Sequence, residues 1–297
     1  MRDHVAASIA FGKLANGGQT CIAPDYALVH EEDIQAFTTA YDEAVAALYP
    51  NGPVSDDYTS IINDRHYSRL TALIDDARAK GARVLELGRN PGDARRRPHT
   101  LAPMIVLDTK DEMRIMQDEI FGPLLPVLSY RDIDEVIRYV NGRPRPLALY
   151  FYGREGEHRR RVLSCTTSGN VTINGTLMHY AQDDLPFGGV GPSGMGAYHG
   201  IEGFRRLSHA KGIFKQGRWS GANLLRPPFG SITNTVLKLM LRQLRSFHNG
   251  GEVSRGSYAR LPAGCHTDLR PCAARIGRRT LHLGTSGTRG SDHRIPA

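Results

Sequence analysis

The chain has 297 residues and a formal net charge of +8, from 38 basic and 30 acidic side chains. Its hydrophobic and charged fractions, 40% and 23%, are typical of an ordered globular protein and exclude a wholly disordered chain. No run reaches the roughly 18 apolar residues of a membrane-spanning helix, so we expect no integral membrane segment. The start of the chain has a short apolar core interrupted by Lys13, which does not fit a signal peptide. We therefore expect a cytoplasmic protein with free thiols.

The positive charge is concentrated near the end of the sequence. Residues 246–297 contain eight arginines and three acids, which supplies +5 of the total and leaves +3 for the residues before them. Basic surfaces bind nucleic acid. Here the excess lies outside the regularly patterned part, so we expect no nucleic-acid partner.

Helical and extended patterns alternate along the chain. Apolar residues at three- and four-residue spacing predict helices over residues 33–49, 64–80 and 133–140. Short apolar runs predict strands over residues 83–87, 103–107, 124–130, 147–152 and 170–174. This alternation predicts an α/β fold with a mostly parallel sheet covered by helices.

The pattern changes at Pro227-Pro228. Residues 232–244 form a short basic amphipathic segment, which we interpret as a docking helix rather than a membrane anchor. Apolar periodicity then ends, and Gly, Ser, Arg and Pro dominate residues 246–297. That composition predicts a disordered basic tail, and its arginine-only positive charge fits an out-of-frame extension.

A cysteine follows a glycine-rich turn in residues 16–21, NGGQTC. Such a turn lets the backbone approach a substrate closely, and the cysteine's own N–H can point at a developing oxyanion. Since a free thiol has a pKa of about 8.5, a nucleophilic role requires surroundings that favour the thiolate. These residues alone leave two alternatives for Cys21, a nucleophile or a buried apolar side chain.

Residues 119–123, EIFGP, precede the strand predicted at 124–130. The carboxylate of Glu119 could accept two hydrogen bonds from ribose hydroxyls, and the ring of Phe121 could flank a nicotinamide. The same residues also fit a helix-to-strand turn with a surface acid.

A glycine-rich loop occupies residues 186–196, PFGGVGPSGMG. Gly189, Gly191 and Gly194 match the G-x-G-x-x-G spacing of dinucleotide-binding turns. That motif requires a strand before it and a helix after it within a βαβ unit. Pro192 interrupts the motif and no such unit follows, so we reject this interpretation.

Taken together and in this order, the three blocks resemble the aldehyde dehydrogenase superfamily. Further matching runs are GNVTIN at 169–174, LPFGGVG at 185–191, SGMG at 193–196 and YHG at 198–200. They are similar to the branch that contains coniferyl-aldehyde and fatty-aldehyde dehydrogenases. The resemblance covers residues 6–245.

The resemblance implies oxidation of an aromatic or long-chain aldehyde with NAD or NADP as the cofactor. Cys21 would attack the aldehyde to give a thiohemiacetal and then a thioester, with its own N–H as half of the oxyanion hole. Glu119 would hold the nicotinamide ribose, with Phe121 beside the ring. Asn174 and the 187–196 loop would close the site and its subunit contacts. No metal is expected.

Part of the family's machinery has no counterpart in the 20 residues before Cys21. The family's general base lies in an E-L-G-G-K motif upstream of the cysteine, and its dinucleotide-binding domain also precedes it. Glu86-Leu87-Gly88 resembles the motif but follows the cysteine, so we interpret it as a strand end. We therefore expect a C-terminal half that is weak or inactive alone and whose partner is a second copy, in a homodimer, or a complementing N-terminal half.

The expected organisation has three parts. Residues 1–217 form the catalytic half, including an oligomerisation strand near 169–174, residues 218–245 form an amphipathic extension, and residues 246–297 form the tail. Two other functions stay open: a non-catalytic remnant or interaction protein of the same fold, and a cofactor-independent thiol esterase.

Overall fold

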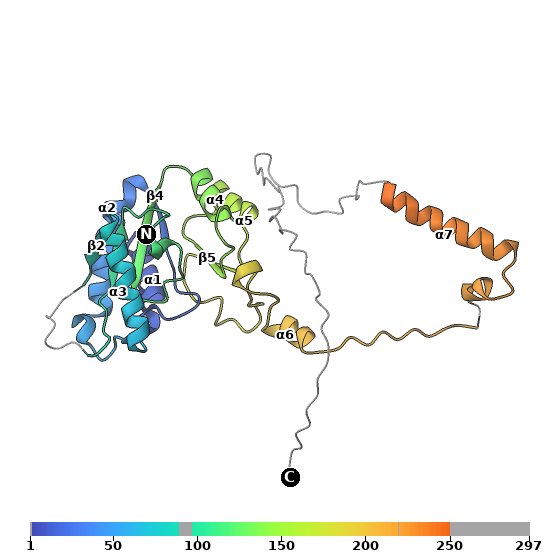
Figure 1. Cartoon of the computed structure of the whole chain (residues 1–297), viewed down its shortest axis with the longest axis horizontal. Helices are drawn as coiled ribbons and strands as arrows, with labels where there is room; N and C mark the ends of the chain where they lie inside the picture. Colours follow the sequence, from blue (N-terminus) through green and yellow to red (C-terminus); the bar gives the residue numbers. More distant parts are fainter. Residues whose placement is uncertain (1, 89–96, 219, 250–297) are drawn as a thin grey trace, which may run out of the picture. The chain divides into compact units, whose positions relative to one another are not determined.

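The computed structural model describes residues 2–88, 97–218 and 220–249 (Figure 1). The helices are α1 (Arg2–Leu14), α2 (Ile34–Leu48), α3 (Asp64–Ala79), α4 (Ile133–Asn141), α5 (Glu157–Cys165), α6 (Gly200–Arg206) and α7 (Ser231–Asn249). The strands are β1 (Ala27–His30), β2 (Arg83–Glu86), β3 (Met104–Leu107), β4 (Leu124–Tyr130), β5 (Ala148–Phe151) and β6 (Asn170–Ile173).

The main sheet has the strand order β1-β4-β3-β2. Strand β4 pairs in parallel with both β1 and β3, whereas β2 runs antiparallel to β3 at the edge. Strands β5 and β6 form a second, parallel pair. The predicted α/β fold with a mostly parallel sheet is therefore confirmed.

The central strands are apolar on both faces because helices cover both sides of the sheet. All four residues of β3 are buried. Met104 and Val106 belong to a core cluster with Leu70 and Leu73 of α3. The alternate residue Ile105 packs in a second cluster, with residues of α1 and α2. The period-two alternation of a strand thus places α3 on one face and α1 with α2 on the other.

Local signals explain where two helices begin and end. The side chain of Asn63 accepts a hydrogen bond from the His66 N–H at 2.9 Å, which caps α3. Gly81, with φ of +94°, follows the end of α3 in the left-handed conformation that glycine adopts without strain. Asp132 caps α4 by accepting from the Glu135 N–H at 2.9 Å.

Most of the predicted elements are confirmed with small shifts of their ends. Helix α7 confirms the amphipathic segment predicted at 232–244 and continues into the first residues of the predicted tail. The rest of that tail, residues 250–297, lies outside the described residues. Helix α1 was not predicted. Within the described residues, none of the helices combines the length and the apolar character that crossing a membrane requires.

The burial of α3 gives a direct test of the fold. Leu70 is 0% exposed, and its side chain fills the space that a Cβ at Gly122 would occupy. We expect Leu70→Ala to lower the free energy of unfolding by about 2–5 kcal/mol, because it removes buried methyl groups and leaves a cavity. Leu207→Ala, at a side chain that is 93% exposed, should change it by less than about 0.5 kcal/mol. Urea unfolding measures both, and equal effects would contradict the packing described.

Candidate functional site

Cys21 lies in the loop between α1 and β1. Three consecutive residues before it, Asn16, Gly17 and Gly18, have φ of +54°, +64° and +76°. The predicted glycine-rich turn is therefore present, and it adopts the left-handed conformation that glycine allows without strain. Cys21 itself is exposed and is a free thiol, so the alternative of a buried apolar cysteine is wrong.

Gln19 fixes this loop against a neighbouring segment. Its amide donates to the Asn16 carbonyl at 3.0 Å and to the Ser60 carbonyl at 3.2 Å. Its side-chain oxygen accepts from the Ile62 N–H at 3.0 Å. The conformation of the loop around Cys21 is therefore determined by side-chain and backbone bonds rather than by the turn alone.

The strand pairing brings Glu119 to the same end of the sheet as Cys21. Cys21 precedes β1, and Glu119 precedes β4, and these two strands pair in parallel with Ala27 opposite Val127. Segments that enter neighbouring parallel strands meet at the amino end of those strands. The two predicted site residues thus belong to adjacent loops.

Direct contacts join the two loops. The carboxylate of Asp25 accepts a hydrogen bond from the Ile120 N–H at 3.1 Å. A Cβ added at Gly18 would lie 2.2 Å from the carbonyl oxygen of Gly122, so only glycine permits this approach of the two backbones.

Helix α3 holds the backbone of the Glu119 block. Arg69 donates to the Glu119 carbonyl at 3.0 Å and also to the Ile120 carbonyl. His66 Nε2 lies 2.6 Å from the Phe121 carbonyl oxygen, so this nitrogen carries the donated proton. Phe121 has a φ of +51°, an uncommon value outside glycine, which these bonds maintain.

The side chain of Glu119 is exposed, and among the described residues none donates a hydrogen bond to its carboxylate. Partial loss of hydration and the nearby Asp25 raise the pKa of the Glu119 carboxyl, while Arg69 and Lys13 oppose that shift. Both oxygens are open to hydroxyl donors. The residue therefore fits the ribose-binding role that the resemblance implies.

Lys13 is a site residue that the sequence did not reveal. Its side chain is 0% exposed, and its Nζ lies 4.0 Å from the Asp25 carboxylate. Burial lowers its pKa to about 8, against the opposing charges of Asp25 and Glu119. Asp25, His66 and Arg69 were also missed, because each acts on backbone far away in the sequence.

Six aromatic rings form one cluster next to the loop of Cys21. His179 stacks on Phe187 with ring centres 5.8 Å apart, and Tyr180 meets Phe187 edge-on at 5.2 Å. Tyr150 links the cluster to the loop of Cys21, because its hydroxyl donates to the Ile22 carbonyl at 2.7 Å. We call this set the aromatic cluster; its members are Tyr150, His179, Tyr180, Phe187, Tyr198 and His199.

The glycine-rich loop closes on itself. Phe187 and Tyr198 exchange two backbone hydrogen bonds, at 2.8 and 2.9 Å. A Cβ at Gly188 or Gly189 would lie within about 2 Å of a backbone oxygen, 1.9 and 2.0 Å respectively. The loop follows β6 and, among the described elements, precedes no further strand, which agrees with rejecting a dinucleotide-binding turn.

The structure also places Asn174, Glu86 and Cys165, three further residues to which expectations from the sequence apply. The amide of Asn174 bonds the backbone of Gly153, so in this chain it joins the end of β6 to the end of β5. Glu86 is the last residue of β2, as interpreted. The expectation of free thiols is wrong for Cys165, which is disulfide-bonded. The described residues contain no group of three or more His, Cys, Asp or Glu side chains placed to hold a metal ion.

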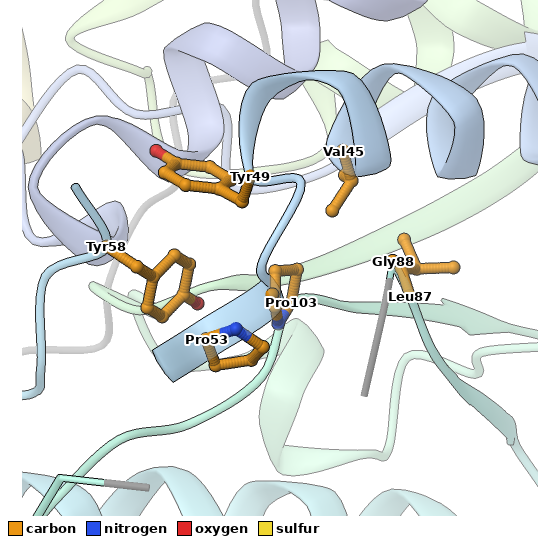
Figure 2. A pocket seen from close by; sticks show the side chains of 8 residues that line it. Val45, Tyr49, Pro53, Tyr58, Leu87, Gly88 and Pro103 are labelled. Carbon is orange, nitrogen blue, oxygen red and sulfur yellow. The ribbon is translucent and has the colours of Figure 1, made fainter. Parts of the chain in front are cut away.

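The structure also has a shallow apolar depression that leaves no space for a water molecule (Figure 2). Tyr49 and Tyr58 form one side of it, with their rings edge-to-face at 5.0 Å. None of the predicted site residues lines it. The lining residues are Val45, Tyr49, Gly52, Pro53, Tyr58, Leu87, Gly88 and Pro103.

Because Gly18 lies against the Gly122 carbonyl, we expect a side chain at position 18 to disturb the loop of Cys21. Gly18→Ala should cost about 1–3 kcal/mol from backbone strain alone, and the overlap with the Gly122 carbonyl must also displace the Cys21 loop. We expect lower stability to urea and a changed rate of Cys21 labelling by a disulfide reagent. Gly212→Ala, whose Cβ would meet nothing within 4 Å, should alter neither quantity. Identical behaviour of the two variants would contradict the contact.

Comparisons with known proteins agree with this arrangement. Residues 2–213 match the model of the aldehyde dehydrogenase family. A probable coniferyl aldehyde dehydrogenase of Pseudomonas aeruginosa is 50% identical over 243 residues, covering 82% of this chain and 50% of the relative. A coniferyl aldehyde dehydrogenase of a Pseudomonas species is 46% identical, covering 80% of this chain and 50% of the relative.

Solved structures give the same result. A substrate-bound structure of Staphylococcus aureus AldH is 38% identical, with a TM-score of 0.69 over 80% of this chain and 51% of that chain. An NAD-dependent aldehyde dehydrogenase of Sinorhizobium meliloti is 25% identical, with a TM-score of 0.65 over 77% of this chain and 44% of that chain. The chain thus spans about half the length of these relatives. It belongs to the aldehyde dehydrogenase family.

Proposed function

We propose that the chain is the cysteine-bearing half of an NAD- or NADP-dependent aldehyde dehydrogenase that oxidises an aromatic aldehyde such as coniferyl aldehyde. The main support is that exposed, free Cys21 lies in a loop packed directly on the block that carries Glu119. The names of the Pseudomonas relatives support the substrate class.

In this proposal Cys21 is the nucleophile. The thiol proton would pass to a base supplied by the N-terminal half, the thiolate sulphur attacks the aldehyde carbon, and the C=O electron pair moves to the oxygen to give a thiohemiacetal anion on the cysteine. The backbone N–H of Cys21 stabilises the developing oxyanion. The Tyr150 hydroxyl, through its bond to the Ile22 carbonyl, fixes the chain directly after the nucleophile.

The cofactor would supply the hydride acceptor. Glu119 would hold its nicotinamide ribose through the exposed carboxylate, and Phe121 would lie beside the ring. Two facts support this fit: the side chain of Glu119 is unengaged by the described residues, and its backbone is held by Arg69. Glu119 is therefore presented in a fixed position with its acceptors free.

The aromatic cluster supports an aromatic substrate over a long-chain aliphatic one. Phe187 and His179 are each only 5% exposed, whereas Tyr180 and Tyr198 are about half exposed, at 51% and 47%. Burial lowers the pKa of His179, which favours the neutral ring, and this ring hydrogen-bonds with the Thr172 hydroxyl at 2.7 Å. Rings with one packed side and one open side favour stacking with a planar ligand.

Replacing the nucleophile tests the reaction. Because the chain spans half of its relatives, it should be joined to the N-terminal half of the Pseudomonas aeruginosa relative and assayed for NADH formation with coniferyl aldehyde. We expect the assembly to be active, the isolated chain to be nearly inactive, and Cys21→Ala in the assembly to lose about a thousandfold or more. Leu207→Ala is the matched control. Full activity of Cys21→Ala, or cofactor-independent ester turnover alone, would contradict the proposal.

Substrate preference tests the aromatic cluster. In the same assembly, Tyr180→Ala should lower kcat/KM for coniferyl aldehyde about tenfold relative to octanal, because an aromatic pair contributes about 0.5–1.5 kcal/mol beyond its buried area. Phe229→Ala, at an exposed ring outside the aromatic cluster, should leave the ratio unchanged. An unchanged ratio in Tyr180→Ala would remove the aromatic cluster from substrate selection.

A further inference from the structure

The most unusual polar group in the described residues is the ammonium of Lys13. The side chain is 0% exposed, and among the described residues its Nζ has no hydrogen-bond partner. The nearest carboxylate oxygen, Oδ1 of Asp25, lies 4.0 Å away. Burial of an ammonium without hydrogen bonds is strongly unfavourable unless another interaction compensates it.

Lys13 lies where four segments meet. It belongs to α1, and it faces Asp25 on the Cys21 loop and Glu119 on the block before β4. Arg69 of α3 is the other cation acting on both carboxylates. Asp25 Oδ1, the oxygen nearest Lys13, is also the acceptor of the Ile120 N–H. A single carboxylate oxygen therefore connects the buried cation to the backbone next to Glu119.

We propose that Lys13 is a positioning residue that acts through Asp25: its ammonium holds the Asp25 carboxylate, which in turn fixes Ile120 and the orientation of Glu119. This rests on the proposed function, in which Glu119 binds the nicotinamide ribose. An ionised Asp25 is an acceptor only, whereas a protonated carboxyl competes as a donor and weakens the bond to the Ile120 N–H.

The charges around the pair agree with this role. Burial raises the pKa of Asp25, and Lys13 is the strongest of the groups that lower it. The pKa of Lys13, about 8 when folded, lies below its ordinary value of 10.5. Because the folded state favours the neutral amine, the contribution of Lys13 to the free energy of unfolding is fully present only above pH 10.5. It is lost as the pH falls through about 8, where the buried amine becomes charged. At neutral pH the charge is kept at a cost in stability, as is common for groups retained for function.

The NMR chemical shifts of the Ile120 amide, measured in the full chain, report directly on its hydrogen bond to Asp25. Its proton and nitrogen shifts should follow two steps with pH, one in the acid range from Asp25 and one near pH 8 from Lys13. In Lys13→Met the step near pH 8 should disappear, and the acid step should move up by about half a pH unit or more. Lys13→Arg should restore the acid midpoint. Lys80→Met, at a helix-end lysine paired with Asp76 at 2.8 Å, is the matched control.

Two outcomes would overturn the proposal. One is an Ile120 titration in the unsubstituted chain that shows the acid step but no step near pH 8. This outcome can be observed even if the variants fail to fold. The other is the same acid midpoint in Lys13→Met and the unsubstituted chain, which would leave Lys13 a space-filling residue.

A second experiment, on cofactor binding, distinguishes failure of this proposal from failure of the proposed function on which it rests. In the enzyme assembled with the relative's N-terminal half, we expect Glu119→Gln to raise the KM for the cofactor severalfold with little change in kcat, and we expect Lys13→Met and Asp25→Asn to do the same. If Glu119→Gln has no effect on that KM, the ribose-binding role of Glu119 is wrong. If Glu119→Gln raises it and the other two variants do not, the positioning role of Lys13 is wrong.

Discussion

The parallel pairing of β1 with β4 is the constraint on which the candidate site depends. It sets Ala27 opposite Val127, so the loops that enter the two strands emerge side by side. A slip of one residue in this register would turn the apolar side chains of β4 to the wrong faces, which the two core clusters prevent. Packing of the core and proximity of Cys21 to the Glu119 block are thus consequences of one register.

Backbone contacts then refine what the register brings together. Gly18 lets the two loops approach to a distance that no side chain would permit. Asp25, His66 and Arg69 all bond backbone atoms of residues 119–121 rather than the side chain of Glu119. The block is therefore held firmly while its carboxylate stays open, which is how a rigid scaffold presents a binding group.

The sequence predicts the strands and the turn before Cys21 for physical reasons that are local, whereas the roles expected of Cys21 and Glu119 come from the resemblance of three separate blocks to one family. The conformation of β3 follows from its apolar run, and that of the turn before Cys21 follows from its two glycines, so a few neighbouring residues are enough to predict each. Lys13 shows the limit of such reasoning. A lysine in a short apolar stretch indicates only that the stretch is not a signal peptide, whereas its burial depends on Asp25 and Glu119, far along the chain. Helix α1 was missed for the same reason, since its core contacts are with distant segments.

The two ends of the candidate site differ in how much change they should tolerate. At the Glu119 end the buried ammonium of Lys13 interacts with the charges of Asp25 and Glu119, and Arg69 acts on both carboxylates, so a change of one charge there alters several neighbours at once. The aromatic cluster has its inner rings buried and its outer rings half exposed, so an outer ring such as Tyr180 can be changed while the stacked pair of His179 and Phe187 is kept. Variation in substrate preference should therefore be tolerated at the rim of the aromatic cluster. The proposed cofactor end should tolerate less, because Lys13 is fully buried and a change at Asp25 would remove the carboxylate nearest to its ammonium.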